Sequence, residues 1–390
     1  MSVLFNRLKE TNGSFNTYAE VLSGLERQQL SLGNVYLQLT PLCNLSCTMC
    51  YAKMTLEEVH KTGQKILRFN EWKNYIDSFL EMGVSDISFT GGECTIHPDF
   101  ERIYRYAYDL GFGIAILTNG SQISDELYEL FIEKPPACIA VTVYGSKEGT
   151  YQQLCKNKQA YSEVFKNVVR LIQGGFNVKV KYTIVQENIK DLQEVYEFFE
   201  KYGIELRYQT HLLKFNNADE ETISKVVVDE EEIKNIEKQM FGDKYQTDND
   251  EYDIIAVKAY RNRRKLPKNG VRCAAGQSIC HIRWDGQMTP CVSLETCVRD
   301  PRIIGFEKAW KNMNQWAQAA PVIEECDHCV HLLKCPSCIA LHYNDTNVEG
   351  IPSPRFCWKR NHPQEAKAIE KRLVEKGLIS FGELNEIRKQ

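Results

Sequence analysis

The chain has 390 residues, of which 43% are hydrophobic and 26% charged, and its net charge is −4. This length allows two or three domains with a real core, and the composition is that of an ordinary globular protein. The weakly acidic balance argues against nucleic-acid or membrane partners held by general electrostatics. No apolar run is long enough for a signal peptide or a bilayer span, so we expect a cytoplasmic protein.

Strands and helices alternate through the first half of the chain. A helix is expected near Tyr18–Leu30, and the alternation of Val35, Leu37 and Leu39 predicts a first strand. Five more strands are expected, at Asp86–Thr90, Gly113–Thr118, Cys138–Tyr144, Val178–Val185 and Glu205–Thr210. The helices between them are expected from an N-cap at Asn70 to Gly83, and at Pro98–Leu110, Ser124–Glu133, Tyr161–Gln173 and Ile189–Lys201.

This βαβ order predicts an α/β fold with a parallel sheet that curls into a partial (β/α)6 TIM-like barrel. Six units fall short of the eight that close a barrel, so we expect an opening that could admit a large substrate. The expected organisation is an N-terminal helical extension (1–34), the partial barrel (35–213), a bridging region (214–272), a small cysteine-rich domain (273–360) and a helical tail (361–390).

Three cysteines follow the first strand in one loop. Cys43, Cys47 and Cys50 are too close in sequence for all three side chains to enter a core. Thiolates are preferred ligands of iron–sulfur clusters and of zinc. Structural zinc usually takes four protein ligands in two pairs, whereas a [4Fe–4S] cube held by three cysteines keeps one iron free for another ligand. The spacing therefore favours a cluster over zinc.

Further unusual residues follow the next strands. Gly91-Gly92-Glu93 comes after the second strand, Asn119-Gly120 after the third, and Tyr144-Gly145-Ser146 after the fourth. Ligands gather at the carboxyl ends of parallel strands, so we expect one site at this rim. The two glycines would let the backbone approach a ligand with its amide groups free, and Glu93 could accept a hydrogen bond from a cationic amine.

The C-terminal part is rich in cysteine, and eight thiols there match two clusters of four: Cys273, Cys280, Cys291, Cys326, Cys329, Cys335, Cys338 and Cys357. The pair Cys326/Cys329 and the pair Cys335/Cys338, each spaced as Cys-x2-Cys, would in isolation also suit a zinc ribbon. Asp285-Gly286 predicts a two-residue hairpin turn, which would set Cys280 opposite Cys291, about 5 Å away. In the bridging region, the basic stretch from Lys258 to Lys268 forms either a solvated face or a basic wall for an acidic substrate segment.

The two motif sets together resemble the radical SAM enzymes with a C-terminal SPASM domain, in particular the maturases of ribosomally made peptides (RiPPs). The first half is similar through the three-cysteine loop, Gly91-Gly92-Glu93 and the segment 141–151. The second half is similar through Cys273, Gly286 shortly before Cys291, the run Cys326–Cys338, and Cys357.

The resemblance implies three [4Fe–4S] clusters and S-adenosyl-L-methionine (SAM) as cofactors. Cys43, Cys47 and Cys50 would hold the catalytic cluster, and its free iron would bind SAM. Gly91, Gly92 and Glu93 would hold the methionyl amine, Thr142 would lie near SAM, and Met49 would stand where the family usually has an aromatic residue against the adenine. One auxiliary cluster would take Cys326, Cys329, Cys335 and Cys357; the other would take Cys273, Cys291 and Cys338, with Cys280 as its fourth ligand.

The implied reaction is cleavage of SAM to a 5′-deoxyadenosyl radical, which takes a hydrogen atom from a peptide that is then oxidised or cross-linked. The expected partners are the peptide and an external one-electron reductant such as a flavodoxin or ferredoxin. Since only about 34 residues precede the first strand, leader recognition would need a separate protein or the bridging region.

Three other functions stay open. A peptide epimerase would need a cysteine that returns a hydrogen atom, for which Cys94 and Cys155 are the catalytic candidates and Cys138 and Cys297 weaker ones, although free cysteines more often simply pack. Radical oxidation of a small molecule would use the same chemistry. A non-catalytic electron-transfer or zinc-scaffold protein is the alternative outside enzymes.

Overall fold

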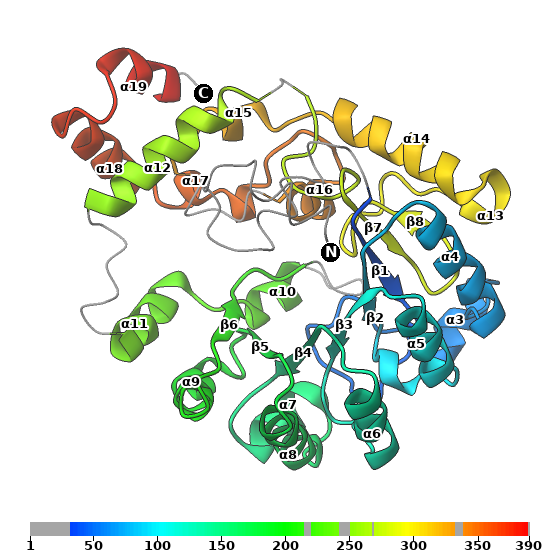
Figure 1. Ribbon diagram of the computed structural model, residues 1–390. Helices are drawn as coiled ribbons and strands as arrows, with labels where there is room; N and C mark the ends of the chain where they lie inside the picture. Colours follow the sequence, from blue (N-terminus) through cyan, green and yellow to red (C-terminus); the bar gives the residue numbers. More distant parts are fainter. Residues whose placement is uncertain (1–31, 214–219, 242–249, 267–268, 332–337, 389–390) are drawn as a thin grey trace.

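The computed structural model describes residues 32–213, 220–241, 250–266, 269–331 and 338–388. The expected helix at Tyr18–Leu30 and the thiol of Cys335 lie outside these residues. The described part is built around one eight-stranded sheet, and helices α4–α9 follow one of its faces (Figure 1). None of the described helices combines the length and apolarity needed to cross a bilayer.

The sheet has the order β6-β5-β4-β3-β2-β1-β7-β8. Its strands are β1 (Asn34–Gln38), β2 (Asp86–Thr90), β3 (Gly113–Thr118), β4 (Cys138–Val143), β5 (Val178–Thr183), β6 (Leu206–Gln209), β7 (Ile279–Ile282) and β8 (Met288–Thr289). Strands β1 to β6 pair in parallel with their sequence neighbours, as the βαβ pattern predicted. The six expected strands are therefore confirmed, with ends that differ by two residues or fewer.

The helices of the first half are α3 (Leu56–Lys61), α4 (Phe69–Glu81), α5 (Phe100–Asp109), α6 (Asp125–Glu133), α7 (Glu148–Cys155), α8 (Ala160–Gln173) and α9 (Leu192–Glu200), with short 3-10 turns η1 (Cys94–Ile96) and η2 (Ile189–Asp191). The N-cap expected at Asn70 is wrong. Helix α4 begins at Phe69, whose amide donates to the Asp99 carboxylate at 3.2 Å. The carboxylate of Asp99, which is distant in sequence, thus accepts a hydrogen bond from the first amide of α4, where the side chain of Asn70 was expected to cap the helix.

The two faces of the sheet differ because side chains alternate along each strand. Val35 and Leu37 of β1 are fully buried against the helices, while Tyr36 and Gln38 lie on the other face and are partly exposed. We call this second face the open face. In Figure 1 the sheet curves away from helices α4–α9, so the open face is its inner side.

The cysteine-rich segment extends the same sheet, which the sequence did not predict. Strand β7 pairs in parallel with β1 and sets Cys280 beside Val35. A hairpin does follow, but its turn has three residues, because Arg283 donates to Gln287 at 2.8 Å and Gly286 adopts φ +88°. The expected facing of Cys280 and Cys291 is therefore wrong, since His281 pairs with Thr289 and the register is shifted by one residue.

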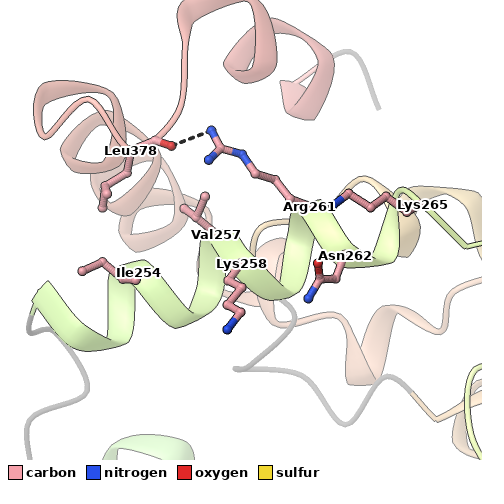
Figure 2. A pocket seen from close by; sticks show the side chains of 7 residues that line it. All are labelled: Ile254, Val257, Lys258, Arg261, Asn262, Lys265 and Leu378. Carbon is pink, nitrogen blue, oxygen red and sulfur yellow. Dashed lines mark hydrogen bonds between the residues drawn. The ribbon is translucent and has the colours of Figure 1, made fainter. Parts of the chain in front are cut away.

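The remaining helices are α10 (Glu220–Val226), α11 (Glu230–Phe241), α12 (Asp250–Arg263), α13 (Pro301–Ile304), α14 (Phe306–Ala319), α15 (Glu324–Asp327), α16 (Ile339–Thr346), α17 (Trp358–Asn361), α18 (Pro363–Glu375) and α19 (Phe381–Arg388), with the 3-10 turn η5 (Pro354–Phe356). Helix α12 packs on α18 and α19 through a second apolar cluster that includes Val257, Tyr260 and Leu373. A pocket of about 300 Å³ lies at this contact, where Arg261 donates to the Leu378 carbonyl at 2.9 Å (Figure 2).

Candidate active site

The three-cysteine loop is fixed by the end of a helix that the sequence did not predict. Ser46 and Thr48 donate their amides to the carbonyls of Cys155 and Leu154, at 3.0 and 2.9 Å. These carbonyls belong to the last turn of α7, where helix carbonyls have no partner within the helix. Two amides of the loop and two carbonyls at the end of α7 thus satisfy one another. The position of the loop after β1 is therefore set by α7.

Gly91 and Gly92 fix the other side of the loop. The amide of Gly92 donates to Thr40 at 2.7 Å, and that of Glu93 donates to Leu42 at 2.9 Å. A Cβ on Gly91 would lie 2.6 Å from the Thr40 carbonyl oxygen, and one on Gly92 would lie 2.3 Å from that of Leu42. The expectation that the amides of the two glycines stay free for a ligand is thus wrong for Gly92. The glycines are required because the cysteine loop itself approaches them.

Glu93 is buried, with 1% of its surface exposed, and its carboxylate joins three segments. One oxygen accepts from the hydroxyls of Thr95 and Thr118, both at 2.8 Å, and the other accepts from the amide of Asn119 at 2.7 Å. Burial raises the pKa of Glu93 although these hydrogen bonds act in the opposite direction. The carboxylate therefore ties the end of β3 to the Gly-Gly-Glu turn.

A small amide network carries this connection on to the first cysteine. The side-chain amide of Asn119 donates to the side-chain oxygen of Asn44 at 2.9 Å and to the Cys43 sulfur at 3.6 Å. Asn44 in turn donates to the Ser121 hydroxyl at 2.8 Å. Sequence reasoning marked Asn119-Gly120 only as a break after a strand and did not single out Asn44 or Ser121. Both residues are polar and adjoin motifs at the carboxyl ends of β1 and β3, and this would have indicated that they belong to the site.

The environment of the cysteines suits a group that takes thiolates. Burial raises the pKa of Cys43 to about 12, so this thiol stays protonated at neutral pH unless a metal replaces its proton. Backbone amides of Leu45 and Lys53 donate to the sulfurs of Cys43 and Cys50, at 3.4 and 3.3 Å. Such bonds to sulfur are among those that tune iron–sulfur clusters.

Two further observations bear on the fit of a cluster. The hydroxyl of Thr48 in this loop is buried and has no hydrogen-bond partner among the described atoms. Among the described residues, no three Cys, His, Asp or Glu side chains converge on a single metal-ion position. Thiolates that hold a cube bind separate irons and need not converge in that way. The lack of such a position is therefore compatible with a cluster held by three cysteines.

A cavity of about 260 Å³ lies beside the loop, at the carboxyl ends of β1 and β2. Four parts of the chain form its walls. They are the loop (Tyr51–Met54), Glu58 of α3, the strand ends (Gln38, Thr90 and Gly91), and the hairpin with the segment that follows it (His281, Arg283, Trp284, Val292 and Glu295). The β7–β8 hairpin therefore completes the site. Burial, together with Arg283, lowers the pKa of His281 to about 3, so this wall carries a neutral imidazole at physiological pH.

The C-terminal thiols divide into two situations. Burial raises the pKa of Cys291 to about 12, and the nearby thiols of Cys273 and Cys338 add to this effect. Burial raises the pKa of Tyr36 on the open face, a hydrogen bond with Ser88 opposes this, and Cys291 adds to it, so Cys291 lies near the open face. Cys280 is fully buried in the main core instead. The reason for expecting it beside Cys291 is thereby lost.

The other expected site residues are placed as follows. Cys94 is fully buried and its thiol donates to the Leu117 carbonyl at 3.4 Å, while Cys155 lies under the loop, where its thiol is hydrogen-bonded to Cys47 and lowers the pKa of that thiol. Met49 is buried in the main core. Thr142 is partly exposed on β4. The thiols of Cys138, Cys326, Cys329 and Cys357 are partly exposed and that of Cys297 is buried, and none of these cysteines forms a disulfide.

Residues 37–199 match the Radical SAM superfamily. The chain is 23% identical over 321 residues to the AdoMet-dependent heme synthase of Oleidesulfovibrio alaskensis, which covers 78% of this chain and 81% of that protein. It is 26% identical over 255 residues to the sporulation killing factor maturation protein SkfB of Bacillus subtilis, which covers 65% of this chain and 59% of that one.

Two solved structures show the same fold at low identity. SuiB of Streptococcus suis bound to S-adenosylmethionine has a TM-score of 0.53 and 12% identity, covering 80% of this chain and 76% of SuiB. The anSMEcpe structure with AdoMet and the Cp18Cys peptide has a TM-score of 0.61 and 15% identity, covering 89% and 98%. The match over residues 37–199 and the cysteine loop within it show that this part of the chain is a radical SAM domain, and the chain is similar to the heme synthase and to the maturation protein SkfB.

Proposed function

We propose that this radical SAM enzyme oxidises or cross-links a peptide. The observation that carries the proposal is the three-cysteine loop, held between α7 and the Gly-Gly-Glu turn beside a cavity at the carboxyl ends of β1 and β2. The peptide as substrate is supported by the likeness to the maturation protein SkfB. The partial barrel leaves its inner face open, which suits a substrate larger than a metabolite.

In this proposal Cys43, Cys47 and Cys50 hold a [4Fe–4S] cluster with one open iron. When bound there, the cluster and SAM supply a 5′-deoxyadenosyl radical that takes a hydrogen atom from a substrate C–H bond. The chain's own residues hold this arrangement in place. Gly91 lines the cavity and would face the methionyl amine, Thr142 would face SAM from β4, and Met49 of the loop packs into the main core.

The C-terminal region would serve as a SPASM domain with two auxiliary clusters. One would use Cys326, Cys329, Cys335 and Cys357. The other would use Cys273, Cys291 and Cys338; the effect of Cys273 and Cys338 on the pKa of Cys291 supports their proximity to it. Cys280 is left out of this set, because it lies in the core beside β1. Auxiliary clusters near the open face suit removal of the electron left on the substrate.

The partners in this proposal are a precursor peptide, a leader-recognition protein, and a flavodoxin or ferredoxin that supplies one electron in the cytoplasm. The test is anaerobic incubation of the reconstituted enzyme with SAM, a reductant and precursor peptides encoded nearby. We expect 5′-deoxyadenosine together with a peptide that has lost two hydrogens. SAM cleavage with no change in any peptide would contradict the choice of substrate, and absence of iron would contradict the enzyme.

A second candidate is oxidation of a small molecule, which is favoured by the likeness to a heme synthase over most of this chain. The same assay with haem precursors in place of peptides separates the two. An epimerase is less well supported. Its hydrogen donor must touch the substrate, whereas Cys94 and Cys155 are both buried and hydrogen-bonded within the protein. Deuterium entering a peptide from heavy water would favour it.

A further inference from the structure

Three cations lie together on the open face at one end of the sheet. Lys179 and Lys181 of β5 alternate with Val180 and Tyr182, which are buried against the helices, so the two lysines project to the opposite face. Arg207 of β6 pairs directly with Lys181. All three are exposed, and in Figure 1 their strands lie at the far end of the sheet from β7 and β8.

These cations are close enough to repel one another. Neighbouring strands are about 5 Å apart, and residues two positions apart on one strand are about 7 Å apart. Although the Lys181 side chain reaches solvent, partial desolvation lowers its pKa; Cys138 of β4 opposes this effect, and Lys179 and Arg207 add to it. In the part of the chain that the structure describes, no carboxylate pairs with either lysine, and Arg207 pairs only with the exposed Glu205, which precedes β6. Adjacent like charges on a sheet are destabilising.

Protection of the sheet edge does not account for the group. Charged residues are common on edge strands because they block pairing with another chain. This explains Arg207, since β6 is an edge strand, but β5 lies inside the sheet between β4 and β6. A solvated outer surface does not account for it either, because the face that carries these cations is the inner side of the barrel.

The row of side chains leads toward the site. Thr142 of β4 pairs with Lys181, which pairs with Arg207, so these three residues form one line across the open face. One residue of this line, Thr142, belongs to the proposed SAM-binding set. A ligand that reaches from the site along the open face would therefore meet the cations next. A single SAM carboxylate would not neutralise three of them.

We propose that Lys179, Lys181 and Arg207 bind carboxylates of the substrate, so that the enzyme selects a substrate with at least two acidic groups near the reacting position. This inference rests on the proposed function, because it assigns a chemical class to the substrate of the same site. For a peptide substrate, the acidic groups are aspartate or glutamate side chains beside the modified residue. For a small molecule, they are its own carboxylates.

The test measures binding and needs no turnover. Two rhodamine-labelled peptides, one rich in glutamate and its glutamine counterpart, are titrated by anisotropy with the full reconstituted protein and SAM, and propane-1,2,3-tricarboxylate is added as a competitor. The variants are K181Q, the pair K181Q with R207Q, and K181R. The matched control is K166Q, which removes an exposed lysine from α8 on the helical side.

We expect the parent protein and K166Q to bind the glutamate peptide, and the double variant to bind it about tenfold or more weakly, as loss of a charge-assisted bond predicts. K181R should keep most of the affinity. Displacement by the tricarboxylate at lower concentration than by unlabelled peptide would identify a small-molecule substrate; the reverse would identify a peptide. Both results support carboxylate binding.

Equal affinity of the parent and the double variant for the glutamate peptide would overturn the inference. So would a double variant that loses SAM affinity and keeps the peptide, since the cations would then serve the cofactor. The outcome is distinguishable from failure of the proposed function. Charge-selective binding without any peptide product would retain the acidic substrate and reject peptide maturation, whereas a modified peptide without charge-selective binding would do the opposite.

Discussion

Replacing Gly92 by alanine should release the cysteine loop from the Gly-Gly-Glu turn. The new Cβ would lie 2.3 Å from the carbonyl oxygen of Leu42 and 2.6 Å from its carbonyl carbon. Carbon contacts normally need about 3.5 Å, so one backbone must move by about 1 Å. Both atoms belong to backbone, which cannot rotate away as a flexible side chain would.

The cost of this movement has two parts. Overpacking a tight contact costs about 1–3 kcal/mol. The displacement also breaks the hydrogen bonds from Gly92 to Thr40 and from Glu93 to Leu42, each worth about 1 kcal/mol. The sum, about 3–5 kcal/mol, is a large fraction of the stability of a typical domain. We expect G92A to unfold earlier in urea and to lose the iron of the cluster that we propose on Cys43, Cys47 and Cys50.

The assay combines urea unfolding of the protein before reconstitution with iron content and electron paramagnetic resonance afterwards. G149A is the matched control, because a Cβ on Gly149 meets nothing within 4 Å and the residue lies in α7. It should gain up to about 1 kcal/mol from helix propensity and keep its iron. A G92A protein with the parent's stability and the parent's cluster signal would refute the argument that the loop approaches these glycines.

Three further predictions concern the C-terminal half. C280A should keep the parent's iron content and lose only about 1 kcal/mol of packing free energy. C291A should instead lose the iron of the auxiliary cluster that we propose on it. Equal iron loss in both variants would show that Cys280 is a ligand. D253N should destabilise the packing of α12 on α18 by about 3 kcal/mol in urea unfolding, because it breaks a buried carboxylate's pairs with Arg372 and Lys376, both at 2.8 Å; an unchanged midpoint would contradict this. Burial opposes ionisation of Asp253, but these two cations outweigh it and lower its pKa, so its contribution to stability should be complete above the ordinary aspartate pKa and disappear as the pH falls below it. In D253N that acid-dependent part should be missing when unfolding is followed against pH.

The sequence predicted the parts of the fold that depend on local pattern. The six parallel strands followed from alternating apolar residues and from their spacing with helices, and each was found within two residues of its expected ends. The cysteine loop and the Gly-Gly-Glu turn were placed at the carboxyl ends of their strands for the same reason. The sequence analysis missed some short helices. Among them α7 matters most for the site, because its last carbonyls accept hydrogen bonds from the cysteine loop, and its periodicity does not reveal these contacts.

Register and long-range contact were decided by the tertiary structure. Asp285-Gly286 indicated a hairpin, but a turn of two residues and a turn of three differ by one step, and one step moves Cys280 from the side of Cys291 into the core. The pairing of β7 with β1, the closure of Gly92 on Leu42 and the line from Thr142 to Arg207 all join residues far apart in the chain. Local sequence carries the propensity of each segment, whereas these contacts depend on which segments meet, and that is fixed only when the whole core packs.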